Sequence, residues 1–445
     1  MSHYGRIFLC FFLLSNILFA QEEVRVRVEA LEKQVRELTD EVLRLRNALQ
    51  LQEKTTEKLL QEKNNSPTKL YDGLIVSFQR ENQENSLVGF YSSLTRSEIW
   101  IGGYLETQLQ SQESRDGKNA LDLSSLGLQV RSSWSSFFSV DAEFKISHPE
   151  KIEIIHAYWL TSIEDFFNLK IGVIRVPLGR YNLLYSPPAQ SLGSIPLFHE
   201  FFLPSVWSEP GISLSGEWEK GIPFKIRYDM LLSNGLGAGS FQSNERYKVV
   251  QQEIHEDNNK DKQGSIRIEI SPKFSLDIIN LQMGVSGAIG KYDDKNQNQY
   301  KAISLDFSFR IGPFSFIGDY DQIEFLGEYT HFSIERSRET LAEFPQTASR
   351  MEGIYYQVDY SFFPQSWRSV NFLFGEKSTF ALAFRYEKNG IHAKSLTSTN
   401  AYTVGFHFRP QEQMIFRVEY SFIEETIRSQ NDWNNRFLAS FATFF

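Results

Sequence analysis

The sequence predicts an all-β transmembrane barrel of about 16 antiparallel strands, preceded by an N-terminal α-helical coiled coil. Three observations lead to this fold class. Apolar and polar residues alternate from about residue 97 onwards, which is typical of strands with one apolar face. The chain begins with an export-like apolar segment, and its last strand carries an aromatic residue at Phe445.

Residues 1–20 are predicted to be a secretory signal peptide. Arg6 supplies a positive charge, an apolar run follows from Ile7 to Phe19, and Ala20 is a small residue at the cleavage position. The run is shorter than the ~20 residues of a membrane-spanning helix. The single cysteine, Cys10, lies inside this segment, so we expect the mature protein to contain no disulfide.

Residues 21–63 are predicted to form a periplasmic coiled-coil helix. Apolar residues recur at alternating steps of three and four, with charged residues between them, as in a heptad repeat. The apolar seam consists of Val28, Leu31, Val35, Leu38, Val42, Leu45 and Leu49. Because a single helix would expose this seam, we expect a homo-oligomer; the alternative is a helix packed on its own domain. Val at a with Leu at d favours two strands, whereas Arg27–Glu32 resembles a trimer-specifying pattern, and we favour a trimer.

Residues 64–96 are interpreted as a linker or entry segment, because Asn64-Asn65-Ser66-Pro67 breaks the helix. Whether residues 73–94 add a strand pair or a plug is left open. Metal, cofactor and nucleic-acid sites are not predicted, since no Cys/His cluster or phosphate-binding glycine loop occurs and the net charge is -9.

Residues 97–445 are predicted to form the barrel. Ile303, Leu305 and Phe307 alternate with polar residues, a pattern shared by soluble sandwiches and porins. Aromatic residues make up 14% of the chain, as expected for interfacial girdles. The predicted strands are 97–112, 119–134, 137–147, 152–163, 167–179, 208–219, 222–235, 263–272, 281–293, 301–312, 314–335, 351–364, 379–389, 401–410, 414–425 and 436–445.

The last predicted strand, 436–445, has its aromatic residues on one face. Phe441 and Phe445 share this face, and a terminal aromatic residue resembles the signal by which bacterial outer-membrane barrels are recognised by the barrel assembly machinery. We expect lipid of the outer membrane to cover this face. An even strand number would put both barrel ends, and the coiled coil, in the periplasm.

The segment after the fifth predicted strand stands apart in sequence. It contains Gly172 to Asn182, with a Pro177-Leu178-Gly179 turn, and later Pro204-Ser205-Val206-Trp207-Ser208-Glu209-Pro210-Gly211. These elements resemble those of the phosphate-selective porin O and P family, with architectural likeness over residues 97–445. The resemblance implies a trimer whose third external loop, here residues 180–207, folds inward and narrows the pore.

Charged residues of this loop and its flanks are the candidates for the pore constriction, because charges at a narrow point set selectivity. The candidates are Arg175, Arg180, His199, Glu200 and Glu209. The alternative for the two arginines is ion pairing that holds the loop to the wall. Pro177, Gly179, Trp207 and Gly211 are expected to shape the loop without touching a solute.

Basic residues on the polar face of the strands are predicted to line the lumen. They include Arg131, Lys170, Arg227, Arg267, Arg310, Arg385, Arg409 and Arg417. Acidic residues occupy the same face in similar number, and residues 180–207 contain no lysine. Phosphate selection would need a basic ladder. The mixed charge therefore predicts a weakly selective pore, or a transverse field at its narrowest point.

The sequence favours an outer-membrane porin that lets small hydrophilic solutes or ions diffuse passively. One alternative is an adhesin or structural anchor that uses the coiled coil. A barrel hydrolase is the less favoured alternative, since no G-x-S-x-G or H-E-x-x-H motif accompanies the histidines. We therefore expect a protein that is not an enzyme.

Overall fold

A computed structural model describes residues 74–76, 88–92, 97–112, 119–147, 151–203, 206–241, 261–274, 278–293, 295, 297–318, 321–364, 367, 374–375, 378–393, 396–427 and 430–445. The predicted signal peptide and the coiled-coil residues Val28 to Leu49 lie outside these ranges. Among the described residues, no helix has the length and apolarity needed to cross a membrane.

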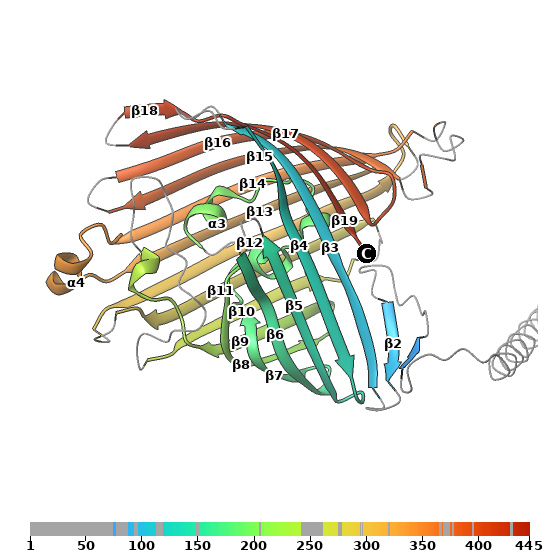
Figure 1. Ribbon diagram of the computed structural model, residues 1–445, viewed down its shortest axis with the longest axis horizontal. Helices are drawn as coiled ribbons and strands as arrows, with labels where there is room; N and C mark the ends of the chain where they lie inside the picture. Colours follow the sequence, from blue (N-terminus) through green and yellow to red (C-terminus); the bar gives the residue numbers. More distant parts are fainter. Residues whose placement is uncertain are drawn as a thin grey trace, which may run out of the picture. The chain divides into compact units, whose positions relative to one another are not determined.

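Strands dominate the described part of the chain (Figure 1). They are β1 (Leu74–Val76), β2 (Val88–Ser92), β3 (Ser97–Gln112), β4 (Asn119–Ser133), β5 (Phe138–Ser147), β6 (Lys151–Glu164), β7 (Phe167–Arg175), β8 (Ser208–Trp218), β9 (Phe224–Ser233), β10 (Gln263–Pro272), β11 (Ile279–Lys291), β12 (Gln299–Phe314), β13 (Asp321–Ile334), β14 (Arg350–Phe362), β15 (Thr379–His392), β16 (Leu396–Arg409), β17 (Met414–Ile427), β18 (Gln430–Trp433) and β19 (Arg436–Phe444).

Sixteen of these described strands close into one antiparallel barrel. Each strand from β3 to β17 pairs with the next, β17 pairs with β19, and β19 pairs back onto β3. The predicted barrel class and all sixteen predicted strands are confirmed. β1 and β2 form a short antiparallel pair. β2 also pairs with the start of β3 at Ser97–Ile101, whereas β19 pairs with the rest of β3 from Tyr104 onwards.

Several predicted strand boundaries are wrong. β16 begins at Leu396, five residues before its predicted start, and two other differences are explained by local hydrogen bonds. The predicted strand 314–335 begins only at Asp321, because the Asp321 carboxylate accepts the backbone N–H groups of Phe316, Ile317 and Gly318 and so fixes a turn. The predicted strand 167–179 ends at Arg175. Beyond it the Val176 N–H donates to the Trp207 carbonyl at 2.9 Å, and Gly179 has a φ of 73°.

The barrel is apolar outside and polar inside. On β12, Ile303 and Leu305 are 46% and 50% exposed, whereas Ser304 and Asp306, which alternate with them, are buried. The same parity holds on β15 and β17, where apolar side chains are exposed and Arg385 and Glu419 are buried. A soluble sandwich would bury the apolar face against a second sheet. An exposed apolar belt around a polar interior is the arrangement of a barrel in lipid.

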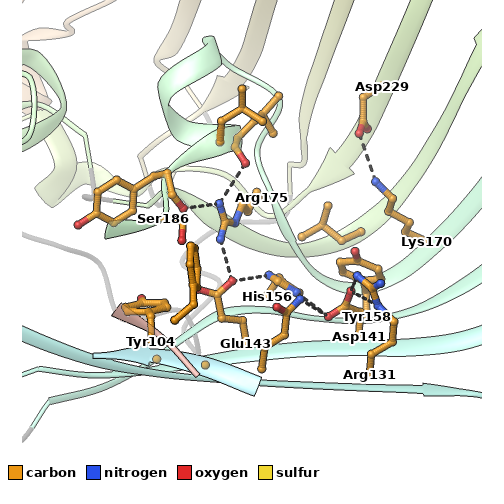
Figure 2. A pocket seen from close by; sticks show the side chains of 18 residues that line it. Tyr104, Arg131, Asp141, Glu143, His156, Tyr158, Lys170, Arg175, Ser186 and Asp229 are labelled. Atoms are coloured by element: carbon orange, nitrogen blue, oxygen red, sulfur yellow. Dashed lines mark hydrogen bonds and ion pairs between the residues drawn. The ribbon is translucent and has the colours of Figure 1, made fainter. Parts of the chain in front are cut away.

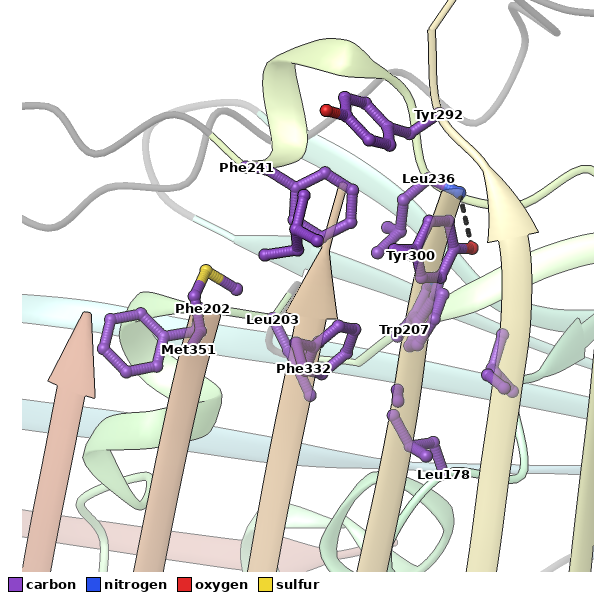
Figure 3. Packing of buried hydrophobic residues seen from close by; sticks show 14 of the residues in the cluster. Leu178, Phe202, Leu203, Trp207, Leu236, Phe241, Tyr292, Tyr300, Phe332 and Met351 are labelled. Atoms are coloured by element: carbon purple, nitrogen blue, oxygen red, sulfur yellow. Dashed lines mark hydrogen bonds between the residues drawn. The ribbon is translucent and has the colours of Figure 1, made fainter. Parts of the chain in front are cut away.

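A hydrophobic cluster lies inside the barrel at the end where β7, β9 and β11 finish (Figure 3). Its members come from the ends of the strands and from the connections after β7 and β9. They include Leu178, Phe202, Leu203, Trp207, Leu236, Phe241, Tyr292, Tyr300, Phe332 and Met351. Phe332 and Tyr300 have no exposed surface. Apolar side chains therefore occupy part of the barrel interior at this end.

Candidate functional site: the inner loop and the lumen wall

The connection between β7 and β8, residues 176–207, is named the inner loop. It contains α2 (Arg180–Leu184), the 3₁₀ helix η1 (Pro187–Ala189) and α3 (Leu197–Phe201). Asn182 ties its two stems together. The Asn182 amide donates to the carbonyls of Val176 and Trp207 at 2.8 and 3.0 Å, and its oxygen accepts the Trp207 N–H at 2.7 Å.

Glu328 on β13 anchors the start and the second half of the inner loop together. Its carboxylate accepts the Tyr181 N–H at 2.9 Å and lies 2.8 Å from Nε2 of His199. Both Glu328 and His199 are buried. Gly179 precedes this contact, and a Cβ there would overlap the Glu328 carboxylate. A glycine at this position therefore permits both the positive φ and the close approach of Glu328.

Inward-facing charges on β15 and β17 hold the middle of the inner loop. Glu387 accepts the Leu197 N–H at 2.6 Å, and Glu419 accepts the Gly193 and Ser194 N–H groups at 2.9 and 2.8 Å. Arg385 donates to the Ser194 carbonyl at 2.9 Å. Because these bonds come from inward residues of distant strands, the inner loop lies within the lumen (Figure 1).

Arg417 on β17 completes this anchoring. Its guanidinium donates to the Pro187 carbonyl at 2.8 Å, to Ser440 on β19 at 2.8 Å and to Glu106 on β3 at 2.6 Å. Arg417 and Glu106 are almost fully buried. Charge-assisted hydrogen bonds of this kind are strong when water is excluded.

On the opposite side, a cavity of about 360 Å³ separates the inner loop from the wall formed by β3 to β9 (Figure 2). The wall is a ladder of alternating charge. Arg131 pairs with Asp141 at 2.8 Å, and His156 lies 3.1 Å from Asp141 and 3.5 Å from Glu143. Glu143 in turn pairs with Arg175 at 2.9 Å.

The inner-loop side of the same cavity is mainly apolar. It is formed by Leu183, Leu184 and Tyr185, together with Ser186. Leu184 is 52% exposed although it lies inside the barrel. Burial raises the pKa of the Tyr185 hydroxyl well above its usual range, so that this ring remains neutral. The cavity is therefore charged on one side and mainly apolar on the other.

A second cavity of about 760 Å³ lies next to the first, toward the turns that precede β5 and β7 and the end of β8. Leu183, Leu184 and Asp229 line both cavities. Here too the wall carries paired charges, because Arg227 contacts both Glu217 and Glu269 at 3.3 and 3.1 Å. The two cavities therefore lie next to each other beside the inner loop.

The five predicted constriction residues are distributed around the inner loop instead of forming one cluster. Arg175 lines the first cavity and also donates to the Leu183 and Tyr185 carbonyls, both at 3.0 Å. Arg180 donates to Gln282 at 2.6 Å, and His199 is buried against Glu328. Glu200 pairs with Arg436 at 3.0 Å, and Glu209 accepts from the Trp207 indole at 3.0 Å.

Of the eight predicted wall residues, four line the cavities, two lie on the wall elsewhere and two bind the inner loop. Arg131, Lys170 and Arg227 line the two cavities, and Arg267 lines the second while pairing with Asp306 at 2.5 Å. Arg310 forms a half-exposed pair with Glu324, and Arg409 donates to the Glu412 carbonyl. Arg385 and Arg417 bind the inner loop.

Sequence analysis did not identify the apolar residues that pack inside the barrel at its loop end. Phe332, Tyr300 and Met351 face inward near strand ends, where alternation alone would expect polar side chains. The sequence did contain a sign of this cluster, because aromatic and apolar residues stand next to a loop at positions where the alternation predicts polar side chains. Leu183 and Leu184 were also missed, since their exposure depends on how the inner loop folds.

No protein-family model matches this chain. An uncharacterized protein of Aquifex aeolicus is 24% identical over 280 residues, which is 59% of this chain and 61% of that relative.

Solved structures with a similar fold include an anion-selective porin from Comamonas acidovorans (TM-score 0.48, 10% identity, 78% of this chain and 100% of that one). The outer membrane channel DcaP of Acinetobacter baumannii gives a TM-score of 0.48 at 11% identity, over 80% of this chain and 99% of that one. OmpT of Vibrio cholerae in its trimer form gives 0.48 at 9% identity, over 78% and 99%.

Proposed function

We propose that this protein is an outer-membrane porin through which small hydrophilic solutes or ions diffuse passively, and that the inner loop narrows its pore. The observation that carries the proposal is the combination of an apolar exterior with a lumen that still contains two neighbouring cavities beside the inner loop. An apolar exterior requires lipid, and a polar lumen with open volume requires water.

The route runs between the inner loop and the wall of β3 to β9. The hydrophobic cluster occupies the interior at the loop ends of β7, β9 and β11 to β15, and Glu387, Glu419 and Arg417 hold the inner loop to β15 and β17. Arg175 is the predicted constriction residue best placed to meet a solute, because it lines the cavity at the point where the loop begins. Arg180, His199, Glu200 and Glu209 would act by fixing the loop.

The charges along this route support weak ion selectivity. The first cavity is lined by three carboxylates, Asp141, Glu143 and Asp229, and by three permanent cations, Arg131, Lys170 and Arg175. Equal numbers of opposite charges in close pairs leave little net potential for anions or cations to follow. A phosphate-specific channel is not the function that we propose.

Assembly follows from the sequence predictions. We propose that the coiled coil of residues 21–63 joins the barrels into a trimer, and that Phe441 and Phe445 serve recognition by the barrel assembly machinery. Phe445, which follows β19, is 49% exposed, and Phe441 on β19 packs against Phe416 with ring centroids 4.7 Å apart.

Planar-bilayer recordings of the purified full-length protein test the function. The proposal predicts stable conductance steps that rise with salt concentration, and a reversal potential close to zero in a potassium chloride gradient. Folded protein that inserts into the bilayer but conducts no ions would contradict it. A large reversal potential would contradict the proposed weak ion selectivity but would still agree with a conducting pore.

A further inference from the structure

The cavity beside the inner loop has two unlike sides, and this asymmetry carries an inference about the solute. A purely aqueous pore has no physical reason to hold a half-exposed leucine in its lumen, where no lipid covers it. Leu184 is 52% exposed, and it lines both cavities together with Leu183. A solute with an apolar part would gain from covering this surface.

The facing wall offers a cation and an anion side by side. Lys170 on β7 and Asp229 on β9 approach to 3.5 Å, and about a fifth of each side chain is exposed, at 22% and 20%. This contact is longer than a charge-assisted hydrogen bond of ~2.8 Å. The Lys170 ammonium also lies 5.6 Å from the Tyr158 ring centroid. Figure 2 shows the pair apart from the tighter Arg131–Asp141–His156 group.

A solute that carries an ammonium and a carboxylate a few ångströms apart matches this pair, since its ammonium can contact Asp229 while its carboxylate contacts Lys170. A simple cation or anion would satisfy one partner and repel the other.

We propose that the passage favours zwitterions with an apolar side chain, that is, apolar α-amino acids and short peptides of the same kind. The apolar side chain of the solute contacts Leu184, while its ammonium and carboxylate contact Asp229 and Lys170 on the wall. This inference rests on the proposed function, because it assumes that solutes cross the barrel beside the inner loop.

Liposome swelling with the full-length protein tests the inference. L-leucine and L-asparagine are zwitterions of similar mass that differ in side-chain polarity, and L-arabinose reports whether the pore is open. We expect leucine to enter about threefold faster than asparagine, the gain of partly covering one apolar side chain. Leu184→Ser should remove this difference, whereas Leu184→Met should keep it.

The charged pair is tested with Lys170→Met. This variant should slow leucine and asparagine alike relative to arabinose, since both solutes lose the partner of their carboxylate. A gel-mobility shift on heating verifies that each variant is folded. If arabinose enters but leucine is no faster than asparagine, or if Leu184→Ser leaves their ratio unchanged, the inference is wrong and the porin function stands. If folded protein admits no arabinose, the porin function itself fails.

Discussion

Arg417 on β17 and Glu106 on β3 form an ion pair of 2.6 Å that bridges β19, the strand between them. The two side chains are 1% and 3% exposed. The same guanidinium binds Ser440 on β19 and the Pro187 carbonyl of the inner loop. One side chain thus links the closing strands of the barrel to the loop that fills it.

Arg417→Ala should therefore destabilise the barrel strongly. Removing one partner leaves the Glu106 charge buried without compensation, a loss of about 3–5 kcal/mol in comparable cases. Urea unfolding in lipid vesicles measures this loss. The double variant Arg417→Met with Glu106→Met should be more stable than Arg417→Ala. Arg310→Ala is the matched control, since its pair with Glu324 is half exposed and should contribute less than about 1 kcal/mol. Equal losses for Arg310→Ala and Arg417→Ala would contradict the assignment.

Glu328→Ala should loosen the inner loop without opening the barrel. It removes the acceptor shared by Tyr181 and His199, and each buried donor left unpaired costs about 1–3 kcal/mol. We expect larger and noisier single-channel currents, because a loop released from β13 narrows the pore less. Glu352→Ala, a half-exposed carboxylate on β14, provides the control and should leave the currents unchanged. If the currents of Glu328→Ala channels are as small and steady as those of the wild type, the inner loop does not set the pore width.

Phe332→Ala probes the hydrophobic cluster inside the barrel. Phe332 has no exposed surface and packs against Tyr300 and Phe198, with ring centroids 6.4 and 6.3 Å away. Truncating a buried phenylalanine costs about 3–5 kcal/mol. The temperature at which the folded band is lost in gel electrophoresis should fall. Phe384→Ala, on the outward face at 45% exposure, should lower it less. The reverse order would show that the interior cluster contributes little.

Lys170→Glu tests the charge balance of the passage. Replacing one of three permanent cations in the first cavity by a carboxylate should move the reversal potential toward potassium in a potassium chloride gradient. Lys295→Glu changes the same charge on an exposed loop, where the lysine pairs with Glu339, and should leave selectivity unchanged. Identical shifts for the two variants would indicate that general surface charge, and not the passage wall, sets ion preference.

The barrel could be predicted because alternation is a local property of each strand. Ile303 and Leu305 faced lipid, and Ser304 and Asp306 faced the lumen, as their parity required. Boundaries failed at Asp321 and Arg175, where a side-chain turn and the stem of the inner loop ended the strands. Such endings depend on single hydrogen bonds that periodicity does not record.

The interior of the site could be predicted only in part. Arg385 and Arg417 were expected on the lumen wall, but their partners, the carbonyls of Ser194 and Pro187, come from residues about 190 and 230 positions away. The path of the inner loop decides those contacts, and sequence pattern gives no measure of it. The same path exposes Leu184 and buries His199 within one loop.

Cysteine accessibility in an open channel tests the central claim that solutes pass between the inner loop and the wall of β3 to β9. Gln129 on β4 lines the first cavity, and its neighbour Leu128 is 41% exposed on the outward face. The only cysteine of the sequence, Cys10, lies in the predicted signal peptide, so the introduced residue would be the single cysteine of each mature variant. A charged methanethiosulfonate reagent should lower the current of Gln129→Cys channels and leave that of Leu128→Cys channels unchanged. A Gln129→Cys channel that is fully labelled yet conducts as before would contradict the account.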